Sequence, residues 1–81
     1  MNEQDIVATL QGWFIDKTGA EADPDSRYLE SSGIDSFEVI ELIGFVEDNF
    51  APFRFQSDDF QKTDFFSLNG LARMIAAAAH G

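Results

Sequence analysis

Apolar residues recur at intervals of three and four in three separate stretches of this chain, and this spacing constrains the fold more than any other feature. Such a period places the apolar side chains on one face of an α-helix. We therefore predict helices from Asp5 to about Asp16, from Ser36 to about Phe50, and from Ser67 onward. Their expected buried faces are Ile6, Val7, Leu10, Trp13 and Phe14; Val39, Leu42, Ile43, Val46 and Phe50; and Leu68, Leu71, Ala72, Ile75 and Ala79.

A long loop is predicted between the first two helices. Gly19 can end the first helix, because glycine adopts the left-handed conformation that often follows a helix. Residues 17–34 are rich in Gly, Pro, Asp and Ser, and we expect Tyr28 and Leu29 to anchor them to the core. Loops of this length are uncommon inside small domains and often have a function.

The second half of the chain is predicted to contain a connector and a short helix before the last helix. Residues 52–55 should be extended, and residues 57–62 should form a short third helix with Phe60 directed inward. Ser67 is a suitable N-cap for the last helix. The predicted fold is one all-α domain over residues 1–81, with three long helices and one short helix.

The composition excludes several functional classes. The chain has no cysteine, so it cannot form disulfides or thiolate metal sites. Its 15 acidic and 5 basic residues give a formal charge of −10, which opposes binding to nucleic acid and to anionic lipid surfaces. No basic-then-apolar leader and no apolar stretch of membrane-spanning length is present, so we expect a cytoplasmic protein. Partners with basic patches would complement the charge, but acidity that serves only solubility explains it equally well.

The start of the second helix presents a serine beside a capping pattern. Asp35 and Glu38 have the spacing of a capping box, in which each side chain accepts the other residue's backbone N–H. Gly33 allows the chain to turn into the helix. With Asp35 as N-cap, the hydroxyl of Ser36 is not needed for capping and lies at the positive end of the helix dipole. The alternative is that Ser36 itself is the N-cap and Asp35 a loop residue.

The segment 33–37, Gly-Ile-Asp-Ser-Phe, resembles the Gly-x-Asp-Ser-Leu signature of the acyl carrier and peptidyl carrier protein family. Residues 38–50, the long first loop, the short acidic third helix and the segment 66–71 are similar to that family in order and spacing. The resemblance covers nearly the whole chain and implies an acyl-carrier-like four-helix bundle. Phe37 departs from the signature, which usually has Leu there.

In that family the serine carries 4′-phosphopantetheine, attached from coenzyme A by a separate phosphopantetheinyl transferase. The resemblance therefore implies that Ser36, next to Asp35, is the attachment residue. Nothing in the sequence supports a self-contained active site, and we predict that the chain is not itself an enzyme. The thiol of the arm would hold an acyl or aminoacyl group as a thioester. The implied partners are this transferase, an acyl- or aminoacyl-loading ligase or transferase, and downstream synthases or transferases with basic docking patches. We expect the carrier to be a monomer.

The outward face of the second helix is the expected docking surface for these partners. If the apolar stripe faces the core, a mixed strip of apolar and acidic residues faces outward; it consists of Phe37, Ile40, Glu41, Gly44, Glu47 and Asp48, with Glu38 beside them. A solvated helix face would explain the acids but not the two apolar residues. Gly44 lowers helix stability, so it marks either a close approach of a partner or a neutral exposed position.

Other candidate sites are weaker. Asp23 and Asp25 have the spacing of the first ligands of a calcium loop, but Arg27 occupies the next ligand position, and we reject calcium binding there. His80, the sole histidine, lies too close to the end of the chain for a catalytic base or a metal ligand.

Two classes of function remain open. The first is a free-standing carrier, with specialised biosynthesis of polyketides, nonribosomal peptides or modified fatty acids favoured over housekeeping fatty-acid synthesis. The second is an unmodified acidic helical adaptor that binds a basic partner through residues 37–48.

Overall fold

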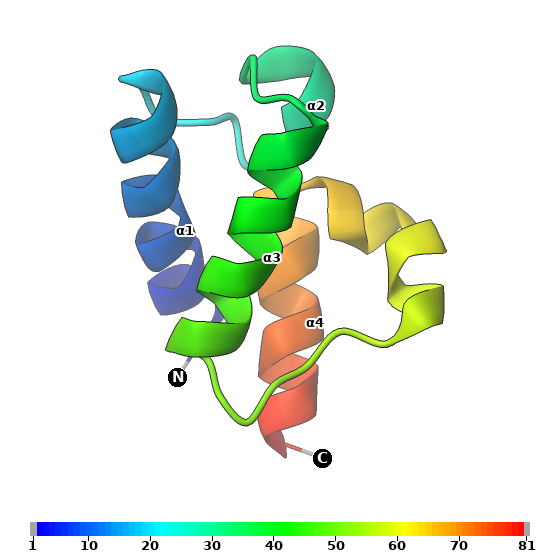
Figure 1. Cartoon of the computed structure of the whole chain (residues 1–81). Helices are drawn as coiled ribbons and strands as arrows, with labels where there is room; N and C mark the ends of the chain where they lie inside the picture. Colours follow the sequence, from blue (N-terminus) through cyan, green and yellow to red (C-terminus); the bar gives the residue numbers. More distant parts are fainter. Residues whose placement is uncertain (1, 81) are drawn as a thin grey trace.

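Helices and turns make up the described part of the chain, residues 2–80 of this computed structural model. The elements are α1 (Glu3–Thr18), α2 (Tyr28–Ser31), α3 (Ser36–Asn49), the 3₁₀ helices η1 (Ser57–Gln61) and η2 (Thr63–Phe66), and α4 (Leu68–His80). The long helices share one core, η2 packs on α4, and both ends of the chain lie at the same end of the molecule (Figure 1). Residues 2–80 contain no strand, which confirms an all-α domain with three long helices and a long gap after the first.

α1 begins and ends where local chemistry satisfies its free backbone groups. The side chain of Asn2 accepts the N–H of Asp5 at 2.8 Å, which caps the first turn. Gly19 adopts a left-handed conformation with φ of 85° and donates its N–H to the carbonyl of Ile15, which confirms that this glycine ends the helix. The predicted apolar stripe of α1 packs into the core, with Trp13 stacked edge-on against Phe14 at 4.9 Å.

α3 and α4 also turn their predicted apolar stripes toward the core. In α3 the most deeply buried members are Leu42 and Val46, and the remaining stripe residues pack around them. Ser67 caps α4 as predicted, because its hydroxyl accepts the N–H of Gly70 at 3.0 Å. The buried stripe of α4 ends at Ala76, so the prediction that Ala79 is buried is wrong. Ala79 lies in the last turn of α4, next to the exposed Ala77 and Ala78. The side chain of His80 lies outside the described part of the chain.

The long loop after α1 contains the one-turn helix α2, which the sequence did not predict. Tyr28 is fully buried, and its hydroxyl donates a hydrogen bond to the backbone carbonyl of Phe65. Burial raises the pKa of Tyr28, so the phenol stays protonated and keeps this bond. The prediction that Leu29 is a second anchor is wrong, because successive helical residues point about 100° apart and Leu29 faces solvent. Ala22 and Ile34 are the other buried residues of the loop.

The segment 57–66 differs from the single short helix predicted over residues 57–62. It forms two consecutive 3₁₀ helices, and Phe60 is 39% exposed rather than directed inward. The buried residue of η1 is Asp59, whose carboxylate accepts the N–H of Gln56 at 2.7 Å and the ammonium of Lys62 at 2.9 Å. These two bonds lower the pKa of Asp59, the first more than the second. Phe60 instead packs its ring against Phe65 at 5.1 Å.

The extended connector after α3 is held by aromatic contacts. The ring of Phe55 packs edge-on against Phe53 at 4.9 Å and against Phe65 at 5.5 Å. Edge-to-face contacts of this kind are favourable because the positive edge of one ring meets the negative face of another. The phenylalanines of the connector therefore fix its course to η2, and through Tyr28 to α2.

Gly70 allows α4 to approach η2 more closely than any other residue would. A Cβ atom built at Gly70 would lie within 2.6 Å of the carbonyl oxygen, the Cα and the carbonyl carbon of Asp64. All three atoms belong to the backbone, so no side-chain rotation relieves the clash. Gly44 is different, because a Cβ atom there would meet nothing within 4 Å.

We therefore predict opposite effects for two glycine substitutions. Gly70→Ala should lower the free energy of unfolding by about 2 kcal/mol or more, because it forces two backbones apart. Gly44→Ala should raise it by up to about 1 kcal/mol, because alanine has the higher helix propensity. Urea unfolding followed by circular dichroism measures both. A Gly70→Ala variant as stable as the wild type would contradict the close approach of α4 to η2.

Candidate functional site

The N-terminus of α3 is organised by a reciprocal pair of hydrogen bonds. The carboxylate of Asp35 accepts the N–H of Glu38 at 2.9 Å, and the carboxylate of Glu38 accepts the N–H of Asp35 at 3.1 Å. Gly33, with φ of 81°, turns the chain into the helix, and the buried side chain of Ile34 anchors it. Asp35 is therefore the N-cap, as the predicted capping box requires.

Ser36 is the first residue of α3 and is exposed to solvent. Its hydroxyl makes no hydrogen bond within residues 2–80, so the alternative in which Ser36 caps the helix does not hold. The first N–H groups of a helix have no partner within the helix, and Asp35 occupies only that of Glu38. The serine oxygen thus lies at the positive end of α3, next to free backbone donors.

Two exposed apolar side chains lie beside this hydroxyl. Phe37 is 79% exposed and Ile40 is 64% exposed, the highest values among the large apolar residues described. On a helical wheel Ile40 and Phe37 lie within about 100° of Ser36, so all three residues share one side of α3. Apolar side chains are exposed singly on many protein surfaces, whereas contiguous apolar patches rimmed by polar residues are typical of interaction sites.

Most acids of the predicted docking strip are already bonded within the protein. Glu38 belongs to the capping box, and Glu41 accepts a hydrogen bond from the ammonium of Lys17 at 2.7 Å. This bond raises the pKa of Lys17, so its ammonium stays charged at neutral pH. Asp48 is exposed and forms no ion pair with another described residue.

Glu47 departs from the predicted outward strip. Its side chain is only 24% exposed, and its carboxylate accepts the N–H of Phe55 at 3.0 Å and lies 3.7 Å from the guanidinium of Arg54. The connector crosses the lower end of α3 at this point and covers Glu47. The open part of the strip therefore runs from Ser36 to Gly44, with Asp48 at its edge.

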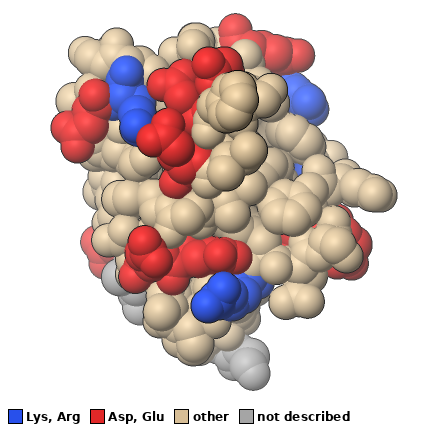
Figure 2. Space-filling view, in the orientation of Figure 1, with Lys and Arg blue, Asp and Glu red and all other residues tan. Residues whose placement is uncertain are grey.

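Acidic side chains form patches on the face of the molecule that carries α3, and few basic side chains lie beside them (Figure 2). Lys17, which pairs with Glu41 of α3, also holds its ammonium 5.8 Å from the ring of Trp13. No sequence pattern indicates that Lys17 pairs with Glu41, because the two residues are on different helices and 24 positions apart. The free negative charge of the strip is consequently smaller than its composition indicates.

The rejected calcium loop has a structural role instead. The carboxylate of Asp23 accepts the N–H of Asp25 and the hydroxyl of Ser26, both at 3.0 Å, and these bonds lower the pKa of Asp23. Asp25 in turn accepts a hydrogen bond from the amide of Asn69 in α4. Residues 2–80 bring no three His, Cys, Asp or Glu side chains into a metal-binding group, and no helix among them is long and apolar enough to cross a bilayer.

Comparison with protein-family models, with curated proteins and with solved structures gives no match to this chain. The functional interpretation therefore depends on the residues around Ser36 and their geometry.

The capping geometry predicts unequal effects for two neighbouring alanine substitutions. Asp35→Ala should lower the free energy of unfolding by about 1 kcal/mol, because the N–H of Glu38 loses its acceptor. Ser36→Ala should change it by less than about 0.5 kcal/mol, because the hydroxyl has no partner to lose. Urea unfolding of both variants measures the difference. The reverse order would show that Ser36, and not Asp35, is the N-cap.

Proposed function

We propose that this chain is a carrier protein that bears 4′-phosphopantetheine on Ser36 and delivers thioester-bound acyl or aminoacyl groups to partner enzymes. The observation that supports this most strongly is the exposed Ser36 hydroxyl, which Asp35 leaves free by capping α3. An N-capping serine would have its oxygen engaged with the backbone, whereas this one is available to a modifying enzyme. The match of residues 33–37 to the carrier signature supports the same conclusion.

The position of Ser36 suits a phosphodiester. Transfer from coenzyme A would join the serine oxygen to the phosphate of the pantetheine arm and release the nucleotide half of the coenzyme. The attached phosphate would then lie at the N-terminus of α3, where the helix dipole and the free N–H groups stabilise negative charge. The phosphopantetheinyl transferase would supply the general base, because no histidine or other base is bonded to this hydroxyl within residues 2–80.

The rest of the chain is compatible with a carrier that has no chemistry of its own. It contains no cysteine, so the thiol on the arm would be the sole thiol of the loaded protein. Tethering an acyl group to a small domain raises its effective concentration at each enzyme to which the domain binds. The proposed fold is accordingly an acyl-carrier-like bundle, in which α3 presents the arm.

The proposed docking surface is the open strip of α3 beside Ser36. The phosphopantetheinyl transferase would contact Phe37 and Ile40 while it attaches the arm, and a loading ligase or a downstream synthase would contact them while it receives the arm. The overall charge of −10 would attract enzymes with basic patches and raise their rate of association with this chain. The aromatic residue after the serine favours partners of a specialised biosynthetic pathway over those of housekeeping fatty-acid synthesis.

A second candidate is an unmodified adaptor that binds a partner through the same strip. The exposure of Phe37 and Ile40 favours it, because two apolar side chains surrounded by acids resemble the centre of a protein interface. In this case the hydroxyl of Ser36 would remain unmodified and would have no role in binding.

Intact mass spectrometry distinguishes the two. After incubation with coenzyme A and a broad-specificity phosphopantetheinyl transferase, the carrier should gain the mass of one phosphopantetheine. Ser36→Ala should gain nothing, while Ser57→Ala, which removes another exposed serine at a helix start before acidic residues, should gain it as the wild type does. No gain by the folded wild-type chain would leave the adaptor as the better description.

The role of Phe37 in docking is tested by kinetics. Phe37→Ala should lower kcat/KM for the transferase about 5- to 30-fold, the range expected when an aromatic contact worth about 1–2 kcal/mol is lost. Its melting temperature should not fall, because the ring is 79% exposed. Ile15→Ala removes an exposed apolar residue on α1 and is the control, with unchanged kinetics expected. Equal rates for Phe37→Ala and the wild type would remove Phe37 from the docking surface.

A further inference from the structure

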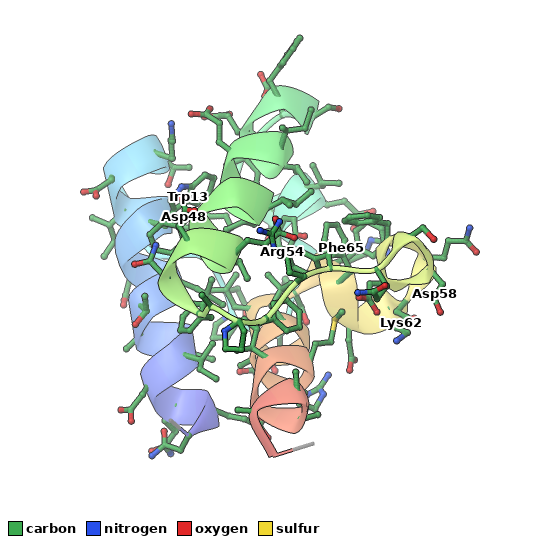
Figure 3. The ribbon with its side chains drawn as sticks, turned by 60° about the horizontal axis from the view of Figure 1, so that its bottom comes forward. Trp13, Asp48, Arg54, Asp58, Lys62 and Phe65 are labelled. Atoms are coloured by element: carbon green, nitrogen blue, oxygen red, sulfur yellow. The ribbon has the colours of Figure 1, made fainter. Side chains whose placement is uncertain are left out.

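A groove of about 980 Å³ lies between the connector and α4. Its walls include Asn49 and Phe50 at the end of α3, about 20 Å from Ser36 at the rise of an α-helix, so it is separate from the carrier site. Figure 3 looks onto this side of the molecule, where the connector with Arg54 crosses α4 and leads to η1. A volume of this size reaches the upper end of the range of about 300–1,000 Å³ found for small-molecule sites.

One end of the groove is apolar. Ile6 of α1 and Pro52 of the connector line it together with Ala77 and Ala78 from the last turns of α4. The two alanines are exposed and too small to fill the space between α4 and the connector. Met74, whose flexible side chain adapts readily to a ligand, lies one turn earlier on the same helix.

The other end of the groove is lined by more than half of the basic residues of the chain. Three of the five basic residues of the chain line the groove, against only two of its 15 acids. The bases are Arg54, Lys62 and Arg73, and the acids are Asp59 and Asp64. In a protein of charge −10, the groove lining therefore holds more bases than acids, although Glu47, just outside the lining, pairs with Arg54.

These basic residues differ in how firmly they are paired. Lys62 binds Asp59 at 2.9 Å, and Arg73 binds Asp64 at 2.9 Å. Arg54 is 76% exposed and lies 3.7 Å from the carboxylate of Glu47, too far for a good hydrogen bond. Arg54 therefore retains free donors for an anionic ligand.

The basic and apolar residues that line the groove occupy different positions along α4 and the connector. On α4, Arg73 precedes Met74 and the alanines, and the N-terminal part of α4 is where η2 packs. On the connector, Pro52 is followed by Arg54 and then by η1, which ends near Lys62 (Figure 3). On both elements the basic lining residues thus lie nearer in the chain to η1 or η2 than the apolar lining residues do.

We propose that this groove binds an amphipathic carboxylate, a single unbranched alkyl chain with one anionic head. The carboxylate would be held by Arg54, with Lys62 and Arg73 beside it, and the alkyl chain would lie over Met74 and Ala78. A cationic or neutral amphiphile would not use the basic end. A second copy of this chain is opposed by the charge of −10 on each molecule. The proposal does not depend on the modification of Ser36.

Titration of the ¹⁵N-labelled chain with decanoate, below its micelle concentration, tests the proposal. Amide shifts should concentrate in the connector, η1 and the second half of α4, and α3 near Ser36 should not respond. Affinity should rise from octanoate to decanoate to dodecanoate, by up to about fourfold for each methylene that becomes fully buried. Decanol should bind more weakly than decanoate at the same residues.

Decyltrimethylammonium is the most informative comparison ligand. A surface with a charge of −10 attracts cations without any specific site, so general electrostatics predicts that this ligand binds better than decanoate. A preference for decanoate at the groove therefore requires a local basic site. Equal or tighter binding of the cation at the groove residues would overturn the proposal.

Substitutions at the charged end of the groove test its contribution to decanoate binding separately from that of the apolar end. Arg54→Gln should weaken decanoate binding about three- to tenfold, because a charge-assisted contact is lost, whereas Arg27→Gln removes a base outside the groove and should not. Asp64→Asn should tighten binding, because it releases Arg73 from its partner.

The apolar end is tested by filling it. Ala78→Trp should weaken binding at least about tenfold, since the loss of a few buried methylenes accounts for such a change. Ala8→Trp, on an exposed position of α1, should have no effect. Circular dichroism confirms that each variant is folded. Unchanged affinity in both Arg54→Gln and Ala78→Trp would overturn the proposal, as would the absence of any localised amide shift.

Discussion

Two hydrogen bonds between Asp35 and Glu38 determine what the rest of α3 presents to solvent. They begin the helix at Ser36 and leave the serine hydroxyl unbonded, while the apolar stripe with Leu42 and Val46 faces the core. If α3 began one residue later with Ser36 as N-cap, the same hydroxyl would be engaged with the backbone. The proposed attachment site therefore depends on which of two adjacent residues caps the helix.

The helix ends, the helix cap and the buried faces that depend on residues close together in the sequence could be predicted. Gly19 ends α1, Ser67 caps α4, and the three apolar stripes face one core, because these features depend on residues a few positions apart. The predictions for Leu29 and Phe60 were wrong, because both side chains are exposed. In η1 the buried residue is Asp59, and a hydrophobic pattern does not show the bonds of its carboxylate to Gln56 and Lys62.

The candidate site was predictable only in part, because some of its contacts join segments that are distant in the sequence. The capping box and the exposure of Phe37 and Ile40 follow from positions on one helix. The pairing of Glu41 with Lys17 and the covering of Glu47 by the connector join distant segments, and the sequence gives no sign of them. The groove beneath the connector is also formed by distant elements, and its basic residues are scattered along the chain.

The two ends of α3 thus have different surroundings: a free hydroxyl with apolar neighbours at one end, and a partly basic groove at the other. The proposal that the free hydroxyl carries 4′-phosphopantetheine is tested most directly by locating the modified residue in the folded wild-type chain. After treatment with a transferase and coenzyme A, fragmentation of the peptide that spans the start of α3 should place one phosphopantetheine on the residue before Phe37. A chain that remains unmodified, or that carries the group on another serine, would contradict the account.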